Sequence, residues 1–531
     1  MPATAAGGEP ASPHFTHRET VVIITGLMLG MFLAALDQTI VATALPRISG
    51  DLNGAGHLSW VVSAYLLTST AATPIYGKLS DLYGRKLMLQ AAIVIFLITS
   101  VLCAVAGSMG QLIAFRALQG LGGGGLLAMA HATIADVLSP RERGRYQGYF
   151  AGVFAAASVI GPVLGGLFAD YLSWRWVFWI NLPIGFAALA VSQFALRRLV
   201  VKRLRHKIDY LGALLIVAGV CCVLLVTTMG GNEAAWDSPL IEGLAGGALV
   251  LFGLCVLQER HASEPILPPR LFRNPVFAVA NFLNLMVSAV MIGSIVFVPL
   301  FLQLVYGMTA GNSGLMLIPL SGATTIGAVS AGRLVAATGR YKLLPIIGLA
   351  SNLAGMVLFS TVTASTPLIL TGAYMVLAGI GLGAVMPVML VAIQNAIEVR
   401  DLGTGTASNS FFRSMGGSFG VALFGAVLLA RLNSAVGSAL GSAGGRQALG
   451  PDPGSALLHA GAEALRLAPA ALQPAIAAGV TDAFHDVFRV GAGISLITLI
   501  AALFLKELPL RTTSGLADKR ASGAAAALAA D

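Results

Sequence analysis

The stretch Gly77–Lys86 reads GKLSDLYGRK, and 255 residues later the stretch Gly332–Tyr341 reads GRLVAATGRY. In both copies a basic residue follows each of two glycines, and a leucine is kept between them. Each copy follows the second long apolar run in a block of six, so the repeat predicts two halves built alike and running in the same direction. The halves differ in one respect, because Asp81 of the first copy corresponds to Ala336 of the second.

The composition assigns both halves to lipid. Of the 531 residues, 56% are apolar and only 10% are charged, and the mean hydropathy is +0.84. Soluble domains carry about 25% charged residues, so a soluble globular protein is excluded. Disorder and a coiled coil are excluded as descriptions of the whole chain. Apolar runs of about 20 residues cross a bilayer as helices, and their number here predicts an all-α polytopic membrane protein.

Fourteen apolar runs, bounded by charged residues, glycine and proline, fall into blocks of six, two and six. The predicted spans cover residues 20–45, 58–76, 87–107, 111–134, 146–170, 176–196, 209–230, 240–259, 276–304, 312–335, 342–361, 366–390, 404–430 and 489–505. The predicted domains are a tail 1–20, a six-helix bundle 21–196, a basic loop with two inserted helices 197–275, a six-helix bundle 276–505 with an external loop 431–488, and a tail 506–531. The alanine-rich part of that loop predicts one or two helices on the outer membrane surface.

The positions of the basic residues predict the orientation. With the N-terminus inside, 24 of the 32 Lys and Arg residues fall on the cytoplasmic side, six fall outside, and Arg116 and Arg413 lie within spans. Because positively charged short loops stay in the cytoplasm, both termini are predicted to be cytoplasmic. The net charge of +9 then reflects topology, and we expect no nucleic-acid partner. We expect no cleaved signal peptide, and free thiols at the four cysteines, which all lie in apolar runs.

One acid stands out because carboxylates are almost absent from the predicted spans. Asp37 lies in the first span, in the string LDQTIVATALP. A buried acid is costly and normally faces a cavity or a partner, so we interpret Asp37 as a site of proton or cation coupling. The alternative is a static Asp bonded to Thr or backbone groups. Arg116 of the fourth span lies at a compatible depth and is its natural partner, although a purely structural ion pair remains open.

The repeated stretch predicts contacts at the inner end of the molecule. Its glycines permit a tight turn, Asp81 can sit at the N-terminus of a neighbouring helix, and Arg85 can pair with Asp136. We interpret these contacts as an inner gate, against the alternative of a solvated basic loop. The residues of this predicted gating loop are Gly77, Lys78, Asp81, Gly84, Arg85, Lys86 and Asp136.

Glycine-rich runs occur in two other spans. The string SVIGPVLGGLFAD predicts close helix packing and a local kink in the fifth span. The run GLGGGG at Gly120–Gly125 lies inside an apolar helix, without a preceding strand or a following Lys-Ser pair, which excludes a nucleotide-binding loop. The fifth-span residues of interest are Gly161, Pro162, Gly165 and Gly166.

Polar residues near the middle of the spans are candidates for substrate contacts. For each of them a helix-to-helix hydrogen bond is an equally good explanation. The candidates are Gln38, Tyr65, Gln119, Asn281, Asn284, Asn409 and Arg413.

Four strings together resemble the fourteen-helix drug:proton antiporters of the major facilitator superfamily, the EmrB/QacA type. They are GKLSDLYGRK, LIAFRALQGLGGG with Arg116, GPVLGG, and LDQTIVATALP. WRWVFWINLPIG at Trp174–Gly185 and FFRSMGGSFG at Phe411–Gly420 are also similar to that subgroup. The resemblance covers essentially the whole chain. It implies two six-helix bundles with two inserted helices, and alternating access between the bundles.

The resemblance also implies roles for the residues named above. Asp37 would be the proton-coupling carboxylate and Arg116 its modulator. Gly161 and Pro162 would form the antiport-determining bend, and Asp81 with Arg85 the cytoplasmic gate. The energy source would be the proton gradient, with no cofactor, no metal and no catalytic residue.

We therefore expect a secondary active transporter rather than an enzyme. It would exchange protons for small lipophilic or cationic compounds across the cytoplasmic membrane of a bacterium, functioning as a monomer in the lipid bilayer. One alternative keeps the fold and exports an endogenous metabolite or lipid. Others are a proton-coupled importer and a membrane-embedded lipid enzyme, although His131 has no evident catalytic partner set.

Overall fold

The fold is known from a computed structural model. It describes residues 17–52, 58–138, 140–196, 209–230, 234–262, 265, 267–308, 310–398, 401–441 and 473–510. Most of the predicted N-terminal tail, the basic loop before the inserted helices, the middle of the predicted external loop and the last 21 residues lie outside these ranges.

The described residues form helices in the order that the apolar runs predict. The first half contains α1 (His17–Asp51), α2 (Leu58–Tyr83), α3 (Arg85–Ala104), α4 (Met109–Val137), α5 (Pro140–Tyr171), α6 (Trp176–Trp179) and α7 (Asn181–Ala195). The inserted pair is α8 (Tyr210–Met229) and α9 (Pro239–His261). The second half contains α10 (Pro269–Phe272), α11 (Pro275–Val305), α12 (Ala310–Leu315), α13 (Ile318–Thr338), α14 (Leu343–Phe359), α15 (Leu368–Ala396), α16 (Leu402–Gly441) and α20 (Gln473–Leu503).

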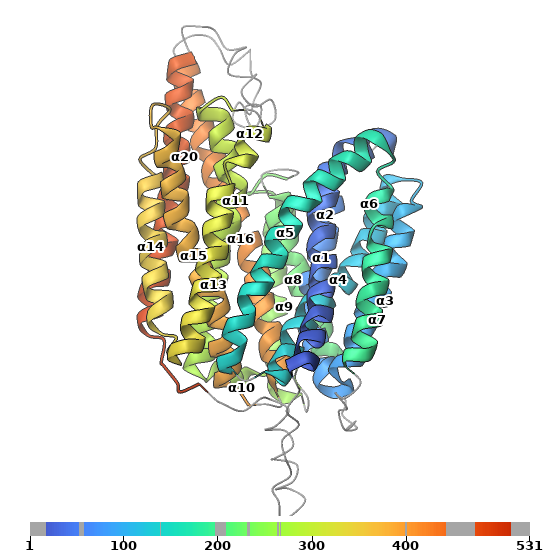
Figure 1. The fold of residues 1–531 in the computed structure, drawn as a ribbon. Coiled ribbons are helices and arrows are strands. Elements are labelled where there is room, and N and C mark those ends of the chain that lie inside the picture. The colour runs from blue at the N-terminus through green and yellow to red at the C-terminus, as the bar shows by residue number, and fades with distance from the viewer. Residues whose placement is uncertain are drawn as a thin grey trace, which may run out of the picture.

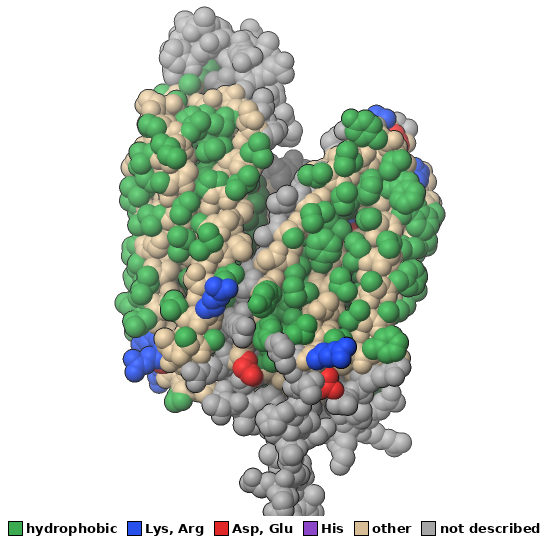
Figure 2. All heavy atoms as spheres, in the orientation of Figure 1, with side chains coloured by type: hydrophobic (Ala, Val, Ile, Leu, Met, Phe, Trp, Pro, Cys, Tyr) green, Lys and Arg blue, Asp and Glu red, His purple; other side chains and the backbone are tan. Residues whose placement is uncertain are grey.

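Ten spans in the described residues are long and apolar enough to cross a membrane, counting α6 with α7 as one and α13 together with part of α12 as another. Two shorter apolar helices, α8 and α14, and the long, less apolar α2 and α5 bring the candidates to the fourteen expected. Apolar side chains cover the sides of both halves in Figure 2, as a surface in contact with lipid requires. The all-α polytopic fold is therefore confirmed.

Local sequence signals set where several helices begin. Ser108 precedes α4, and its side chain accepts a hydrogen bond from the Gln111 amide. Asp209 and Ser238 cap α8 and α9 in the same way, and Asn274 caps α11. These side chains satisfy amides that helix geometry leaves without partners.

Pairs of glycines four residues apart bring neighbouring helices into backbone contact. A Cβ at any of these glycines would collide with the facing helix, so only glycine allows the approach. Two pairs stand in each half, on equivalent helices, and the pairs on α5 and α16 are separated by the same 255 residues as the repeated stretch. The pairs are Gly120 and Gly124 of α4 on α2, Gly161 and Gly165 of α5 on α1, Gly379 and Gly383 of α15 on α13, and Gly416 and Gly420 of α16 on α11.

The repeated stretch is mostly helix, which corrects its interpretation as a loop. α2 continues through Gly77 to Tyr83, and only Gly84 stands in the turn, with a φ of 97°. In the second copy Gly339 ends α13 with a φ of 70°. Such positive φ values favour glycine, which explains why both copies keep it. Gly77 has a different purpose, because it lets α2 approach Gly403 and Ala407 of α16.

The second copy of the stretch has no acid, and its last residue, Tyr341, is hydrogen-bonded to the segment that follows α20. The Tyr341 hydroxyl donates to the Lys506 carbonyl at 3.1 Å and accepts from the Leu508 amide at 2.9 Å. The Glu507 carboxylate accepts from the Tyr341 amide at 3.0 Å. Burial raises the pKa of the Tyr341 phenol, so the hydroxyl keeps the proton that it donates.

The predicted external loop is shorter than expected, because the helices on both sides extend into it. α16 continues to Gly441, and α20 begins at Gln473. Residues 473–488 therefore form one helix with the last span and not a separate surface helix. Their apolar face, including Ile476, Phe484 and Phe488, is buried in the core of the second half, so the same face continues without a break. Residues 442–472 lie outside the described ranges.

The two halves meet at one end of the molecule and separate toward the other (Figure 1). α2 packs on α16, and α5 packs on α13. Figure 2 shows the halves in contact in their lower part and a notch between them above. We call the closed end, where the C-terminus of α2 meets the N-terminus of α16, the latch end. The inserted helix α8 packs on both α2 and α16, so it touches both halves.

A single methyl group should show how tightly the glycine pairs are packed. In Gly383→Ala the added Cβ would meet the Thr324 carbonyl of α13, whereas in Gly247→Ala of α9 it would meet nothing within 4 Å. We expect Gly383→Ala to lower the free energy of unfolding by about 1–3 kcal/mol. Thermal unfolding in detergent measures this. Equal unfolding temperatures for the two variants would contradict the packing described.

Candidate functional site

A buried ion pair lies at the centre of the first half. Asp37 of α1 and Arg116 of α4 are 0% and 1% exposed, and Arg116 Nη1 lies 2.5 Å from Asp37 Oδ2. The second carboxylate oxygen accepts from Gln119 Nε2 at 3.1 Å and from Asn181 Nδ2 at 3.0 Å. Asp37 thus has three donors, which is the environment of an ionised carboxylate.

Arg116 is held on every side. Its Nε donates to the Val61 carbonyl at 3.2 Å, and its Nη1 also donates to Gln119 Oε1 at 2.8 Å. The guanidinium lies over the Tyr65 ring at 4.3 Å and faces the Phe178 ring at 5.9 Å. A planar guanidinium suits this combination of directed bonds and ring stacking better than a lysine ammonium does.

The hydrogen bonds around Asp37 continue to Ser100 and Cys103, so that the polar network connects four helices. Asn181 Nδ2 also donates to Ser100 Oγ at 3.0 Å, and Ser100 Oγ donates to the Phe178 carbonyl at 2.9 Å. The free thiol of Cys103 lies 3.6 Å from Gln119 Oε1. Because α1, α3, α4 and α7 all contribute, a change in the charge of Asp37 acts on the packing of the whole half.

Asn181 and Ser100 are not among the residues singled out from the sequence. Asn181 stands in WRWVFWINLPIG, where it is the one side-chain amide in an apolar string, and that signal could have singled it out. Gln119 was a candidate for a substrate contact or for a helix-to-helix hydrogen bond, and it is fully buried beside Asp37 and Arg116, to which it is hydrogen-bonded. Tyr65 is likewise buried under the Arg116 guanidinium. Gln38 is partly buried on α1.

The glycines of the fifth span lie directly against the helix that carries Asp37. Gly161 and Gly165 face Thr39 and Thr43 of α1, and Thr39 Oγ1 donates to the Ala157 carbonyl of α5 at 2.9 Å. Gly166 has open space around it, so it does not share this contact. The backbone of Pro162 lies within α5, and its side chain is outside the described set.

At the latch end Arg85 collects three partners from its surroundings. Its Nε donates to Asp136 Oδ2 of α4 at 2.8 Å, its Nη2 to Asp81 Oδ1 at 2.6 Å, and its Nη1 to the Ser80 hydroxyl. Arg85 is 1% exposed. Lys78 and Lys86 are partly buried beside it on α2 and α3.

Asp81 connects this cluster to the other half of the molecule. Its carboxylate accepts from the amides of Gly403 and Thr404, at 3.3 and 3.0 Å, and from the Thr404 hydroxyl at 3.3 Å. These amides begin α16, where the helix dipole favours an anion. A Cβ on Gly403 would collide with Arg85 and Asp81, so glycine is needed there. Asp81, the acid that alanine replaces in the second copy of the stretch, is therefore the residue that joins the halves.

The remaining cavity candidates lie on α11 and α16. Asn281 Nδ2 donates to the Phe277 carbonyl of its own helix at 2.9 Å. Asn284 and Asn409 are buried, and Arg413 is partly buried. The structure brings none of these four into contact with Asp37 by a described hydrogen bond.

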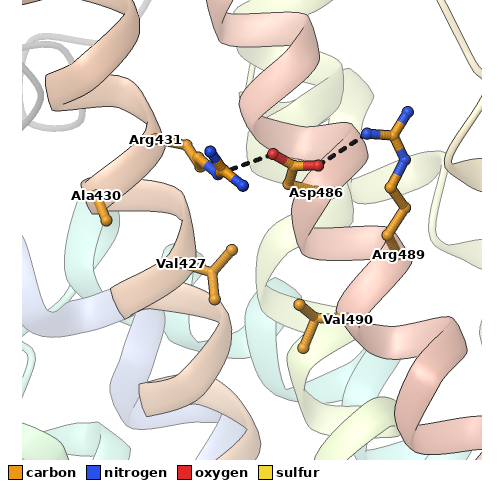
Figure 3. A pocket seen from close by; sticks show the side chains of 6 residues that line it. All are labelled: Val427, Ala430, Arg431, Asp486, Arg489 and Val490. Carbon is orange, nitrogen blue, oxygen red and sulfur yellow. Dashed lines mark hydrogen bonds and ion pairs between the residues drawn. The ribbon is translucent and has the colours of Figure 1, made fainter.

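A groove that the sequence did not predict opens between α16 and α20 (Figure 3). Its volume is about 420 Å³. Asp486 of α20 accepts from Arg431 Nε at 2.9 Å and from Arg489 Nη1 at 2.8 Å. Both arginines are more than half exposed, so these pairs contribute little to stability. The other lining residues are Val427, Ala430 and Val490.

Removing one charge of the buried pair should cost more than removing both. In Arg116→Gln the carboxylate of Asp37 stays buried without its counter-ion, and we expect the free energy of unfolding to fall by about 3–5 kcal/mol. Asp37→Asn in the same chain should restore most of the loss. Thermal unfolding in detergent measures both. The exposed pair Arg489→Gln and Asp486→Asn is the control, with an expected effect of about 1 kcal/mol or less. A double variant no better than the single one would contradict this account.

Weakening the contact between Asp81 and α16 should open the latch end. Ala407 is buried beneath Gly77, so a cysteine placed there, in a chain with the four native cysteines replaced by serine, reports opening by its rate of maleimide labelling. Asp81→Asn removes charge-assisted bonds worth about 1.5–3 kcal/mol each, and we expect labelling at least about tenfold faster. Lys86→Gln, in the same turn, is the control. Equal rates in both variants would show that Asp81 does not hold this end closed.

Comparisons with known proteins agree with the geometry. The Major Facilitator Superfamily (MFS) profile matches residues 27–421. The multidrug transporter protein MdtP of Bacillus subtilis is 37% identical over 509 residues, which cover 92% of this chain and 93% of MdtP. Multidrug resistance protein 3 of the same bacterium is 35% identical over 507 residues, covering 94% and 98%. An uncharacterized MFS-type transporter of Mycobacterium tuberculosis is 39% identical over 521 residues, covering 98% and 74%.

Solved structures share the fold. The proton:xylose symporter XylE superposes with a TM-score of 0.62 at 14% identity, covering 95% of this chain and 99% of its own. The human organic anion transporter MFSD10 superposes with a TM-score of 0.60 at 14% identity, covering 92% and 100%. The family expected from the motifs is confirmed: the chain belongs to the major facilitator superfamily of membrane transporters.

Proposed function

We propose that the protein is a proton-driven efflux antiporter. It exports small lipophilic or cationic compounds across the cytoplasmic membrane of a bacterium by alternating access between its two halves. The relatives named as a multidrug transporter and a multidrug resistance protein, similar over nearly the whole chain, support an efflux role. The observation that carries the coupling is the fully buried Asp37 with its three donors.

Asp37 couples proton binding to a change of packing. When the carboxylate is charged, it bonds to Arg116, Gln119 and Asn181, and these bonds draw α1, α4 and α7 together. A proton on Asp37 removes the counter-charge of Arg116 and weakens the charge-assisted bonds. The helices then favour a different arrangement. The glycines of α5 keep that helix against α1, so the change reaches α5, which packs on α13 of the other half.

In this proposal the latch end faces the cytoplasm. Positively charged short loops stay inside, and Lys78, Arg85 and Lys86 all lie at this end. The described arrangement is then closed toward the cytoplasm and open toward the outside. The Asp81 bonds to the N-terminus of α16 stabilise it. Export proceeds when these bonds break, cargo enters from inside, and they form again. A single chain contains both halves, so a monomer suffices.

Ethidium export from energised cells, and from proteoliposomes with an imposed pH gradient, tests this function. We expect Asp37→Asn to reduce gradient-driven export at least about tenfold at matched expression, because the amide cannot bind and release the proton. Asp482→Asn, at an exposed carboxylate of α20, is the control and should export normally. Undiminished export by Asp37→Asn would exclude Asp37 as the coupling residue, and no gradient-driven export by the natural chain would count against a cationic-drug exporter.

A further inference from the structure

Arg413 of α16 is a cation deep in the membrane without a counter-ion among the described residues. No carboxylate of the described chain forms an ion pair with it. It stands eleven residues after Leu402, the start of the helix, which corresponds to a depth of about 16 Å. The bilayer core is about 30 Å thick, so the side chain starts near the middle. An unpaired cation there is costly and marks a functional site.

Arg413 lies at the interface between the two halves. Its neighbours Phe411, Phe412 and Met415 pack in one cluster with Leu67 and Ala71 of α2. α16 also packs on α4 of the first half, where His131 is buried. The amide of Gln394 crosses the same interface and donates to the His131 carbonyl at 3.4 Å. Arg413 therefore belongs to a part of α16 that packs against the first half.

Two buried amide side chains of the second half, one on α16 and one on α11, also lack hydrogen-bond partners. Asn409 precedes Arg413 by one turn of α16, and its Nδ2 is buried without a hydrogen bond. On α11, which packs against α16, neither Nδ2 nor Oδ1 of Asn284 has a partner. Asn409 and Asn284 are 6% and 1% exposed. Unbonded buried amides each cost stability, so a ligand that bonds to them recovers free energy.

The charge balance of this region decides the class of ligand. The groups on α16 are donors: a guanidinium with five N–H groups and an amide Nδ2. The buried acid of the first half, Asp37, is already bonded to Arg116, Gln119 and Asn181. A cationic ligand finds an unpaired positive charge here, whereas an anionic or electron-rich group finds its counter-charge and its donors.

We propose that the cargo binds between α16 and α4 with an anionic group, such as a carboxylate, paired to Arg413, and with Asn409 as a further donor. The inference rests on the proposed efflux of small lipophilic compounds and departs from it in one respect, the charge: the cargo is an amphiphile that carries a negative charge, so a cation such as ethidium would be a poor substrate. The lipophilic part of the cargo packs on the aromatic and aliphatic side chains beside Arg413.

Equilibrium binding of two dyes that share a xanthene core tests the charge preference. The purified full chain in detergent is titrated against anionic fluorescein and cationic rhodamine 6G, with fluorescence polarisation as the readout. We expect fluorescein to bind at least about tenfold more weakly to Arg413→Gln, as loss of a charge-assisted pair implies, and Arg413→Lys to restore part of the affinity. Rhodamine 6G should bind to Arg413→Gln as well as or better than to the natural chain. Arg333→Gln, at an exposed position of α13, is the control.

Asn409→Ala provides a second test if Arg413→Gln does not fold, and thermal unfolding decides whether each variant is folded. It should weaken fluorescein binding several-fold with little effect on rhodamine 6G. Equal loss of both dyes, or no loss of fluorescein affinity in either variant, would overturn the proposal. Failure of the proposed function is separate, because it appears as intact dye binding without gradient-driven export from proteoliposomes.

Discussion

The structure depends on one constraint, the complete burial of a carboxylate inside the first half. An ionised Asp37 in lipid is tolerable only when donors surround it, and Arg116, Gln119 and Asn181 supply them from α4 and α7. Each donor must itself be fixed, which requires the Val61 carbonyl, the Tyr65 ring and Ser100. The first half is therefore organised around a charge, whereas the second half is organised around an apolar core.

At the latch end a largely buried carboxylate is again surrounded by donors, and in the proposed mechanism some of these bonds break and form again. Asp81 is bonded within its own half by Arg85, and across the interface by the first amides of α16. Backbone amides of a helix N-terminus offer an anion site that needs no side chain, so α16 can leave and return without any rotamer having to be found again. Arg85 and Asp136 remain bonded on one side and keep the carboxylate positioned. The latch is thus built to re-form accurately.

Much of the fold could be predicted because hydropathy, charge and the repeated stretch act locally. The pairing of Arg85 with Asp136 and of Arg116 with Asp37 could be inferred because charges in spans are few and must find each other. The amide partners could not, since Asn181 is one of many polar residues that can bond to any helix. Helix ends were misjudged where apolar faces continue past the membrane, as Ile476 and Phe484 do. The packing role of Gly161 and Gly165 could be predicted, but the helix that each glycine pair faces could not, because that depends on the tertiary arrangement.

The inserted helix α8 has a mechanical consequence. It touches α2 and α16 at once, through Ile216, Leu224 and their apolar neighbours Ala71 and Phe411. Dispersion contacts between such side chains are weak individually and indifferent to small displacements, unlike directed hydrogen bonds. The contacts of α8 with α2 and α16 are therefore apolar and without a fixed direction. In the proposed mechanism, α8 would cover part of the seam between the halves with apolar side chains while α2 and α16 move against each other.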